Sequence, residues 1–167
     1  GILIAGWGIA LDAVVADFIG GAAEQLVLEG ARDADVVLVE GQGSLLHPGY
    51  SGVTLGLLHG SCPATMILCH QASRRFIGEY HGASAWIPIP PLPEVIRRYE
   101  DAAAPVRPAQ VIGVALNTYD LAEAAARDAV RRAEDATGLP ATDPVRFDRA
   151  PLVAAVAAAA RRPRLRA

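Results

Sequence analysis

The chain has 167 residues, enough for one domain with a sizeable core, and its 52% of hydrophobic residues exclude a disordered chain. A net charge of −3 gives no indication of a broad basic face for nucleic acid, and no apolar run reaches the roughly 20 residues that cross a bilayer. Without a signal-peptide pattern either, we expect a cytoplasmic protein that contacts neither nucleic acid nor membrane. All 15 basic residues are arginines, so the chain offers no lysine for a Schiff base or a phosphate loop.

The first part of the chain alternates short apolar runs with helical patterns. Residues 1–8 predict a strand that runs into a Gly-rich turn, and residues 12–30 have apolar positions spaced by three and four, as in a helix. Residues 33–39 form an unbroken run rich in β-branched side chains, which predicts a strand buried on both faces. Residues 53–59 predict one or two helical turns, and residues 64–70 a second buried strand.

The second part begins with an irregular, proline-rich stretch at residues 71–93, within which residues 82–93 are interpreted as an insertion. A short helix is expected at residues 93–101 and a strand at residues 110–116. A strong helix follows, opening at Asp120 or Leu121 and closed by Gly138.

The last elements are a short edge strand within residues 139–147 and an Ala-rich helix at residues 151–162, with a frayed tail at residues 163–167. Strands that alternate with helices predict an α/β sandwich, in which helices flank a mostly parallel sheet. We expect residues 1–162 to form one such domain.

Ligands bind beyond the carboxyl ends of the strands in open parallel sheets, so the polar residues that follow the predicted strands are the candidate site residues. Glu40 follows the run at residues 33–39 and opens a Gly-Gln-Gly-Ser turn. A carboxylate in that place is typical of a Walker B-type site that holds Mg²⁺ against nucleotide phosphates. Gly41 and Gly43 would let the backbone approach a nucleotide closely. The alternative for Glu40 is a cap of the following turn.

The segment His-Pro-Gly-Tyr-Ser offers hydrogen-bond donors and acceptors without the geometry of a metal site. His47 is therefore a candidate for substrate contact or for acid–base catalysis. Tyr50 and Ser51 are candidates for substrate contact, and so are Gln42 and Ser44 just before them. A purely structural role is the alternative for His47.

Two further candidates follow other predicted strands. Asp12, after the first Gly-rich turn, could be a second Mg²⁺ ligand or a plain helix cap. Asn117 ends the strand at residues 110–116, where its amide could read a purine edge or form a turn. His70 and Gln71 occupy the corresponding place after residues 64–70. We expect all of these places to lie along one edge of the sheet.

Three stretches carry a specific resemblance: "GILIAGWGIALDAVVADFIGGAAEQLV", "VVLVEGQGSLLHPGYSGVTLGLLHGS" and "VIGVALNT". Together they resemble the carboxy-terminal domain of a bacterial and archaeal family of unknown function, which includes proteins described as D-glutamate N-acetyltransferases. The resemblance implies a P-loop NTPase-like fold similar to dethiobiotin synthetase. It also implies that Glu40 serves a Mg²⁺-nucleotide and that Asn117 contacts the base. A Gly-rich phosphate loop with its lysine, and an amino-terminal Rossmann-like domain, are then expected before Gly1, so this sequence is interpreted as part of a longer protein.

Three hypotheses for function remain open. The first is the carboxy-terminal part of an acyltransferase that acts on a small amino acid or carboxylate, with N-acetylation of D-glutamate by acetyl-CoA as the specific form. In it Glu40 would hold Mg²⁺ or a water and His47 would take the amine proton. The second is an ATP- and Mg²⁺-dependent ligase or synthetase of the dethiobiotin type. The third is a non-catalytic domain that senses a nucleotide or assembles, and we expect a homo-oligomer that covers an exposed sheet edge.

Overall fold

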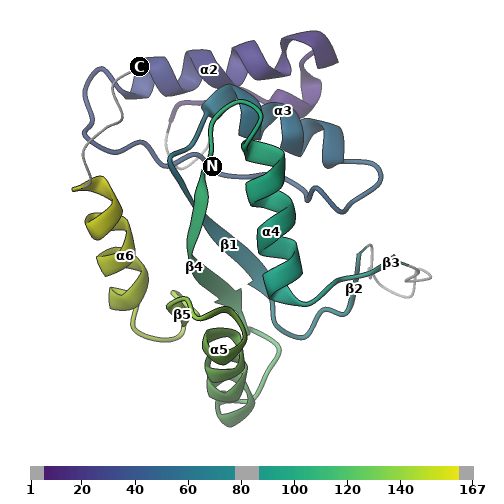
Figure 1. Ribbon diagram of the computed structural model, residues 1–167, viewed down its shortest axis with the longest axis vertical. Helices are drawn as coiled ribbons and strands as arrows, with labels where there is room; N and C mark the ends of the chain where they lie inside the picture. Colours follow the sequence, from purple (N-terminus) through teal and green to yellow (C-terminus); the bar gives the residue numbers. More distant parts are fainter. Residues whose placement is uncertain (1–5, 78–86, 162–167) are drawn as a thin grey trace. The chain divides into compact units, whose positions relative to one another are not determined.

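The computed structural model describes residues 6–77 and 87–161 (Figure 1). The chain divides into two compact units. The first unit comprises residues 1–64 and 98–109, and the second comprises residues 65–97 and 110–167. Within the described residues, no helix is long and apolar enough to cross a membrane.

The first unit is built on two helices, α2 (Ile19–Gly30) and α3 (Ser51–Ser61), which pack against each other (Figure 1). Glycine allows their close approach, because a Cβ atom at Gly60 would lie only 2.1 Å from the carbonyl oxygen of Gly20. A buried core cluster of this unit comprises Leu11, Ala23 and Leu57.

Helix α2 begins later than the sequence predicted. Two short 3₁₀ turns, η1 (Leu11–Ala13) and η2 (Ala16–Phe18), occupy the region where the helix was expected to start. Val14 and Val15 between them are extended, with ψ angles of 139° and 135°, which suits β-branched side chains. Asp12 therefore lies in η1, and the prediction that it caps the helix is wrong.

The strand predicted at residues 33–39 is also wrong. The structure assigns no helix or strand to residues 33–50, and the side chain of Leu38 is 83% exposed. A strand buried on both faces needs hydrogen-bonding partners on its edges. Most of the strand predicted at residues 1–8 falls on residues 1–5, which lie outside the described residues. Glu40 is thus an exposed residue in an irregular segment and does not end a strand.

The second unit contains a three-stranded parallel sheet in the order β1-β4-β5. Strand β1 (Thr65–Gln71) pairs with β4 (Gln110–Asn117), and the short β5 (Ala141–Thr142) pairs with the other edge of β4. The predicted strands at residues 64–70 and 110–116, and the short edge strand after them, are confirmed.

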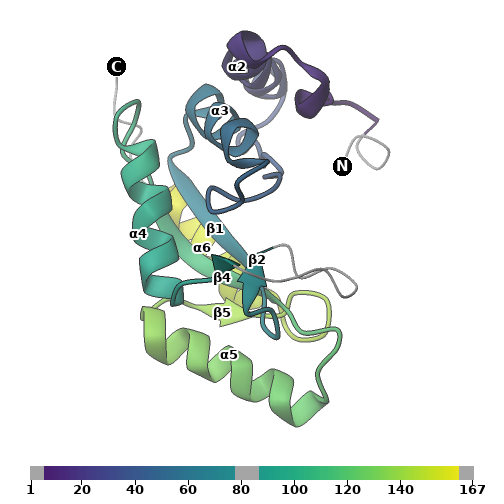
Figure 2. The ribbon, with the colours of Figure 1, turned by 90° about the vertical axis from the view of Figure 1, so that its right-hand side faces the viewer.

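Helices cover both faces of this sheet. A Cβ atom at Gly113 would lie 2.7 Å from Leu152, which places helix α6 (Ala150–Ala160) on the face where Gly113 lies. Because side chains alternate along a strand, Val114 points to the opposite face, where helix α5 (Glu123–Thr137) packs (Figure 2). The main core cluster comprises Val114, Leu116, Ala129, Ala133 and Ala141. A parallel sheet flanked by helices confirms the predicted α/β class.

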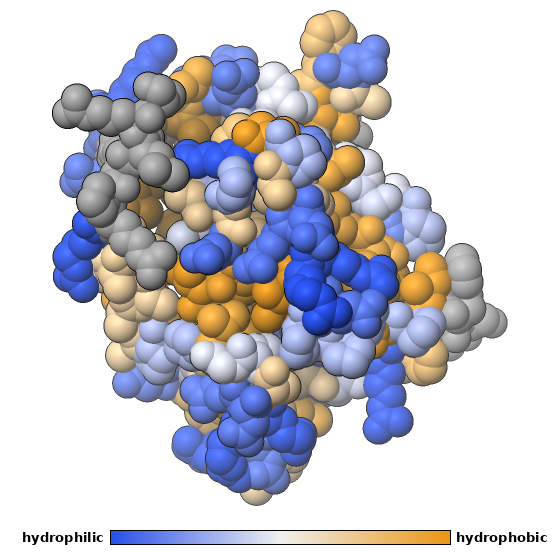
Figure 3. Space-filling view, viewed as in Figure 1, coloured by the Kyte–Doolittle hydropathy of each residue, from blue (hydrophilic) through white to orange (hydrophobic). Residues whose placement is uncertain are grey.

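The remaining elements lie between β1 and β4 in the chain. Strand β2 (Phe76–Ile77) pairs antiparallel with β3 (Ile87–Pro88), and helix α4 (Leu92–Ala103) follows. Part of the predicted proline-rich insertion and the whole predicted tail lie outside the described residues. Helix α5 turns a hydrophilic side to solvent, at the lower end of the view in Figure 3.

Candidate functional site

The candidate residues fall into two groups, one in each unit. The first group lies on the irregular segment of residues 40–50 and at the start of α3. The second lies at the carboxyl end of β4, around Asn117.

The segment after Glu40 is held in a defined shape by its own backbone. Gly43 has a φ angle of 63°, and a Cβ atom there would lie 2.7 Å from Cβ of Tyr50. The buried hydroxyl of Thr54 donates a 2.6 Å hydrogen bond to the carbonyl oxygen of Gln42, which ties the segment to α3. Packing against Tyr50 explains why position 43 is a glycine, whereas a Cβ atom at Gly41 would meet only open space.

Side-chain acceptors bind three backbone N–H groups of the same segment. Ser44 Oγ accepts a 3.1 Å bond from the N–H of Leu46, and the hydroxyl of Tyr99 accepts one from the N–H of Leu45 at 3.2 Å. Nδ1 of His47 accepts a 3.0 Å bond from the N–H of Gly49. These bonds fix the turn that precedes α3.

The side chains of this first site differ in how far they are exposed to solvent. Glu40, Gln42 and Tyr50 are exposed, while His47 and Ser51 are half-buried. The ring of Tyr50 lies 4.5 Å from the ring of His47, centre to centre. The imidazole of His47 and the phenol of Tyr50 therefore lie together, and they are polar groups of the kind that can orient a small ligand.

A metal ion at Glu40 would depend on ligands from elsewhere. Among residues 6–77 and 87–161, no group of three or more His, Cys, Asp or Glu side chains is placed to hold a metal. Mg²⁺ commonly takes only one or two carboxylates and fills its shell with phosphate oxygens and water. Glu40 fits that pattern only together with a bound nucleotide, and the side chain of Asp12 lies outside the described structure.

The second group gathers where the parallel strands end. Gln71 and Asn117 are paired across β1 and β4, as expected for neighbouring strand ends, and the N–H of Ala72 donates to the carbonyl oxygen of Asn117 at 3.0 Å. Oδ1 of Asn117 accepts a 3.1 Å bond from the N–H of Tyr119. Both predicted roles of Asn117 are thus compatible, because the oxygen forms the turn and the amide NH₂ can still donate to a ligand.

A buried carboxylate behind Asn117 was not predicted. Asp143, only 2% exposed, accepts hydrogen bonds from the N–H and the hydroxyl of the buried Thr118, at 2.9 and 2.6 Å. Burial raises the pKa of Asp143, but bonds from Thr118 and from the N–H groups of Arg146 and Val145 outweigh it and hold the pKa below its ordinary value.

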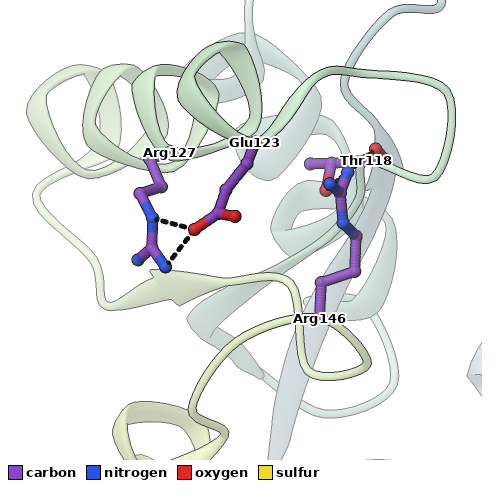
Figure 4. Close-up of polar contacts among 4 residues, drawn as sticks. All are labelled: Thr118, Glu123, Arg127 and Arg146. Atoms are coloured by element: carbon purple, nitrogen blue, oxygen red, sulfur yellow. Dashed lines mark hydrogen bonds and ion pairs between the residues drawn. The ribbon is translucent and has the colours of Figure 1, made fainter.

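Arg146 closes the same network. Its guanidinium donates to the carbonyl oxygens of Thr118 and Leu121, and Figure 4 shows it lying beside Thr118. The same figure shows the ion pair between Arg127 and Glu123, two exposed residues one helical turn apart on α5. The signal for Asp143 in the sequence is an acid directly after a short apolar strand and before a proline, which sequence reasoning did not use.

A hydrogen-bonded set around Ser73 and the imidazole of His70 also belong to this sheet edge. Ser73 donates a 2.6 Å bond to Asp120 and receives one from Gln71, and the bond from Ser73 lowers the pKa of Asp120. Burial and the positive charge of Arg74 lower the pKa of His70, so this imidazole is neutral at neutral pH.

The chain matches the family model described as "Domain of unknown function (DUF1611_C) P-loop domain" over residues 1–153. It is 40% identical to a D-glutamate N-acetyltransferase from Tritonibacter scottomollicae over 166 residues, which cover 95% of this chain and 46% of that protein. It is 39% identical to a D-glutamate N-acetyltransferase from a Pseudoalteromonas species, over 87% of this chain and 43% of that protein. The chain thus spans about half the length of the curated relatives it matches.

A solved structure is similar over nearly the whole chain. The crystal structure of a DUF1611 family protein from Anabaena variabilis matches with a TM-score of 0.85 and 45% sequence identity. The match covers 94% of this chain and 45% of that one.

Proposed function

Because the chain belongs to the DUF1611 family as its carboxy-terminal P-loop domain, we propose that it forms part of an enzyme that N-acetylates D-glutamate or a closely similar amino acid. The observation that carries the proposal is its identity of about 40% to relatives named D-glutamate N-acetyltransferase. The first group of site residues supports it, because it offers hydroxyl and imidazole donors for the carboxylates of such a substrate.

The proposed reaction joins the amino group of the substrate to an acetyl group carried as a thioester, with acetyl-CoA as the donor. The amine nitrogen attacks the acetyl carbonyl carbon, the C–N bond forms and the C–S bond breaks. The thiol leaves with the proton that the amine gives up. In this proposal Tyr50 and Ser51 contact the substrate together with Gln42 and Ser44, and Glu40 holds a water or the neutral amino group before attack.

A chimera tests this proposal in a protein as long as the known relatives. The matched segment of the Tritonibacter protein is replaced by the present chain, and the product is sought by mass spectrometry with D-glutamate and acetyl-CoA, with L-glutamate in parallel. We expect N-acetyl-D-glutamate as the product. Glu40→Gln should lower kcat/KM by about 100-fold or more. The control Asp135→Asn, on the exposed side of α5, should show no comparable loss. A chimera that is folded by circular dichroism yet forms no N-acetyl-D-glutamate contradicts the proposal.

A second candidate function is nucleotide binding, which the description of the family as a P-loop domain favours. In this form the domain would bind an ATP-like nucleotide with Mg²⁺, as an ATP-dependent ligase or as a nucleotide sensor. Glu40 would hold Mg²⁺ together with the phosphates, Gly41 and Gly43 would lie near them, and Asn117 would donate to the base. When bound, the ion would neutralise phosphate charge.

Asn117 offers a sharp test of this second function. Asn117→Asp keeps the oxygen that accepts from the N–H of Tyr119 but removes the amide donor, whereas Asn117→Ala removes both. Binding of a fluorescent ATP analogue with Mg²⁺ is measured by titration. We expect binding by the unaltered protein and at least a tenfold weaker affinity for Asn117→Asp at nearly unchanged stability. Equal affinity would exclude base contact by this amide, and phosphate release would separate a ligase from a sensor.

A further inference from the structure

The imidazole of His47 is held on several sides by its own loop. The N–H of Gly49 donates to Nδ1 at 3.0 Å, and the ring of Tyr50 lies 4.5 Å away, tilted by 37°. The backbone on both sides is fixed as well. The N–H of His47 donates to the carbonyl oxygen of Ser44 at 3.0 Å, and the carbonyl oxygen of His47 accepts from the N–H of Ser51 at 2.9 Å.

This arrangement decides which ring nitrogen carries the proton. A neutral imidazole has one N–H and one lone pair, and a backbone N–H can only donate. Because Gly49 uses the lone pair of Nδ1, the neutral ring of His47 carries its proton on Nε2. The other nitrogen, Nε2, is then a hydrogen-bond donor without a lone pair for a proton.

We propose that His47 acts as a fixed hydrogen-bond donor, through Nε2–H, to an anionic oxygen of the ligand, and that it does not serve as the base that removes the amine proton. The identity of this ligand oxygen rests on the proposed acetylation. That oxygen belongs either to a substrate carboxylate or to the tetrahedral intermediate of acetyl transfer. The amino-terminal end of α3 would favour an anionic oxygen in either case, because His47 precedes that end and the first turn of the helix carries no acidic residue.

The first test measures the tautomer and needs no activity. Long-range ¹H–¹⁵N correlation spectra of the ¹⁵N-labelled protein are recorded at alkaline pH, where imidazole side chains are neutral. His47 is assigned by the signals that disappear in His47→Gln. His59 is the internal reference, because its Nε2 lies 2.7 Å from the carbonyl oxygen of Ala102, which can only accept. We expect both rings to be protonated at Nε2. A ring of His47 protonated at Nδ1, or an equal mixture, would overturn the proposal.

The second test compares two substitutions in the acetylation assay of the chimera. His47→Gln places an amide NH₂ near the position of Nε2, whereas His47→Asn places its amide near Nδ1. A donor predicts that His47→Gln stays within about tenfold of the unaltered enzyme and that His47→Asn loses about 100-fold. A base predicts losses of about 10²- to 10⁴-fold in kcat for both variants, and that result would refute the donor role.

The kinetic parameters then identify the oxygen. A bond to the substrate carboxylate, formed in the ground state, raises KM when it is lost, and a bond to the intermediate lowers kcat instead. Titration of the labelled protein with D-glutamate gives a matching readout, since only the carboxylate arm predicts a shift of the His47 Nε2–H signal. If the chimera forms no product while the tautomer is as expected, the proposed reaction fails and the donor geometry stands.

Discussion

Removal of the buried carboxylate of Asp143 should destabilise the second unit strongly. Asp143→Ala leaves the N–H and the hydroxyl of Thr118 without an acceptor, and Thr118 has no exposed surface through which water could replace it. A buried donor left unpaired costs about 1–3 kcal/mol. Two such donors give about 2–5 kcal/mol, after allowance for the desolvation of the carboxylate that the alanine avoids. The N–H groups of Val145 and Arg146 add little, because both residues are exposed.

The measurement is urea unfolding followed by circular dichroism, together with amide hydrogen exchange of β4. Exchange at Val114 and Leu116 reports on the second unit alone, which matters because the chain has two compact units. Asp135→Ala, on the exposed side of α5, is the control and should stay within about 0.5 kcal/mol of the unaltered protein. Equal stabilities for Asp143→Ala and the control would refute the hydrogen-bond network as a source of stability.

The pH dependence gives an independent check with a defined sign. The pKa of Asp143 is lower in the folded protein than the ordinary value of an aspartate, about 4. The unfolded chain therefore binds more protons in this range, and the stabilisation is present above the ordinary pKa and is lost as pH falls through the folded pKa. Between about pH 5 and pH 3, the unaltered protein should lose more stability than Asp143→Asn, which has no such carboxylate to protonate.

Three further predictions concern the helix crossing, the irregular segment and the sheet edge. Gly60→Ala should destabilise the first unit by about 1–3 kcal/mol in urea unfolding, because its methyl group would overlap the carbonyl oxygen of Gly20, whereas Gly52→Ala, with open space, should be neutral or stabilising. Tyr99→Phe should lower stability by about 1 kcal/mol by the same measurement, since it removes the acceptor of one backbone N–H. His70 should titrate by NMR below the usual imidazole range, so its burial should reduce stability as pH falls below about 6.5.

Most of the second unit could be predicted from the sequence, although the short strands β2 and β3 fall in the stretch that was predicted to be irregular. Strands β1 and β4 and helix α5 stand within a few residues of their predicted bounds, because each carries a strong local pattern. Alanines at positions 126, 129 and 133 line the buried face of α5, and Gly138 ends it with a φ angle of 67°. In these elements, local preference and tertiary packing agree.

The first unit was harder to predict, for a physical reason. The run at residues 33–39 has the composition of a buried strand, but a strand forms only when neighbours satisfy its backbone groups, and the sequence does not state which neighbours are present. Val14 and Val15 fit a helical spacing, yet they are extended, because the spacing of apolar residues does not report a local β-branched interruption. Helix α3 came out longer than the predicted 53–59, since Ser51 and Gly52 carry no helix signal of their own.

The candidate site shows the same division between local and distant information. Sequence reasoning proposed Asn117 because it ends a strand, whereas Asp143 binds the next residue, Thr118, from 25 residues away in the chain. The two roles are linked, because Thr118, which Asp143 holds by two hydrogen bonds, is the next residue after Asn117. A loss of ligand binding in an Asp143 variant would therefore combine a displaced Asn117 with a less stable sheet edge. Asn117→Asp separates the two effects, because it keeps the oxygen that accepts from Tyr119 and replaces the amide NH₂, the group proposed to contact the base, by a charged oxygen.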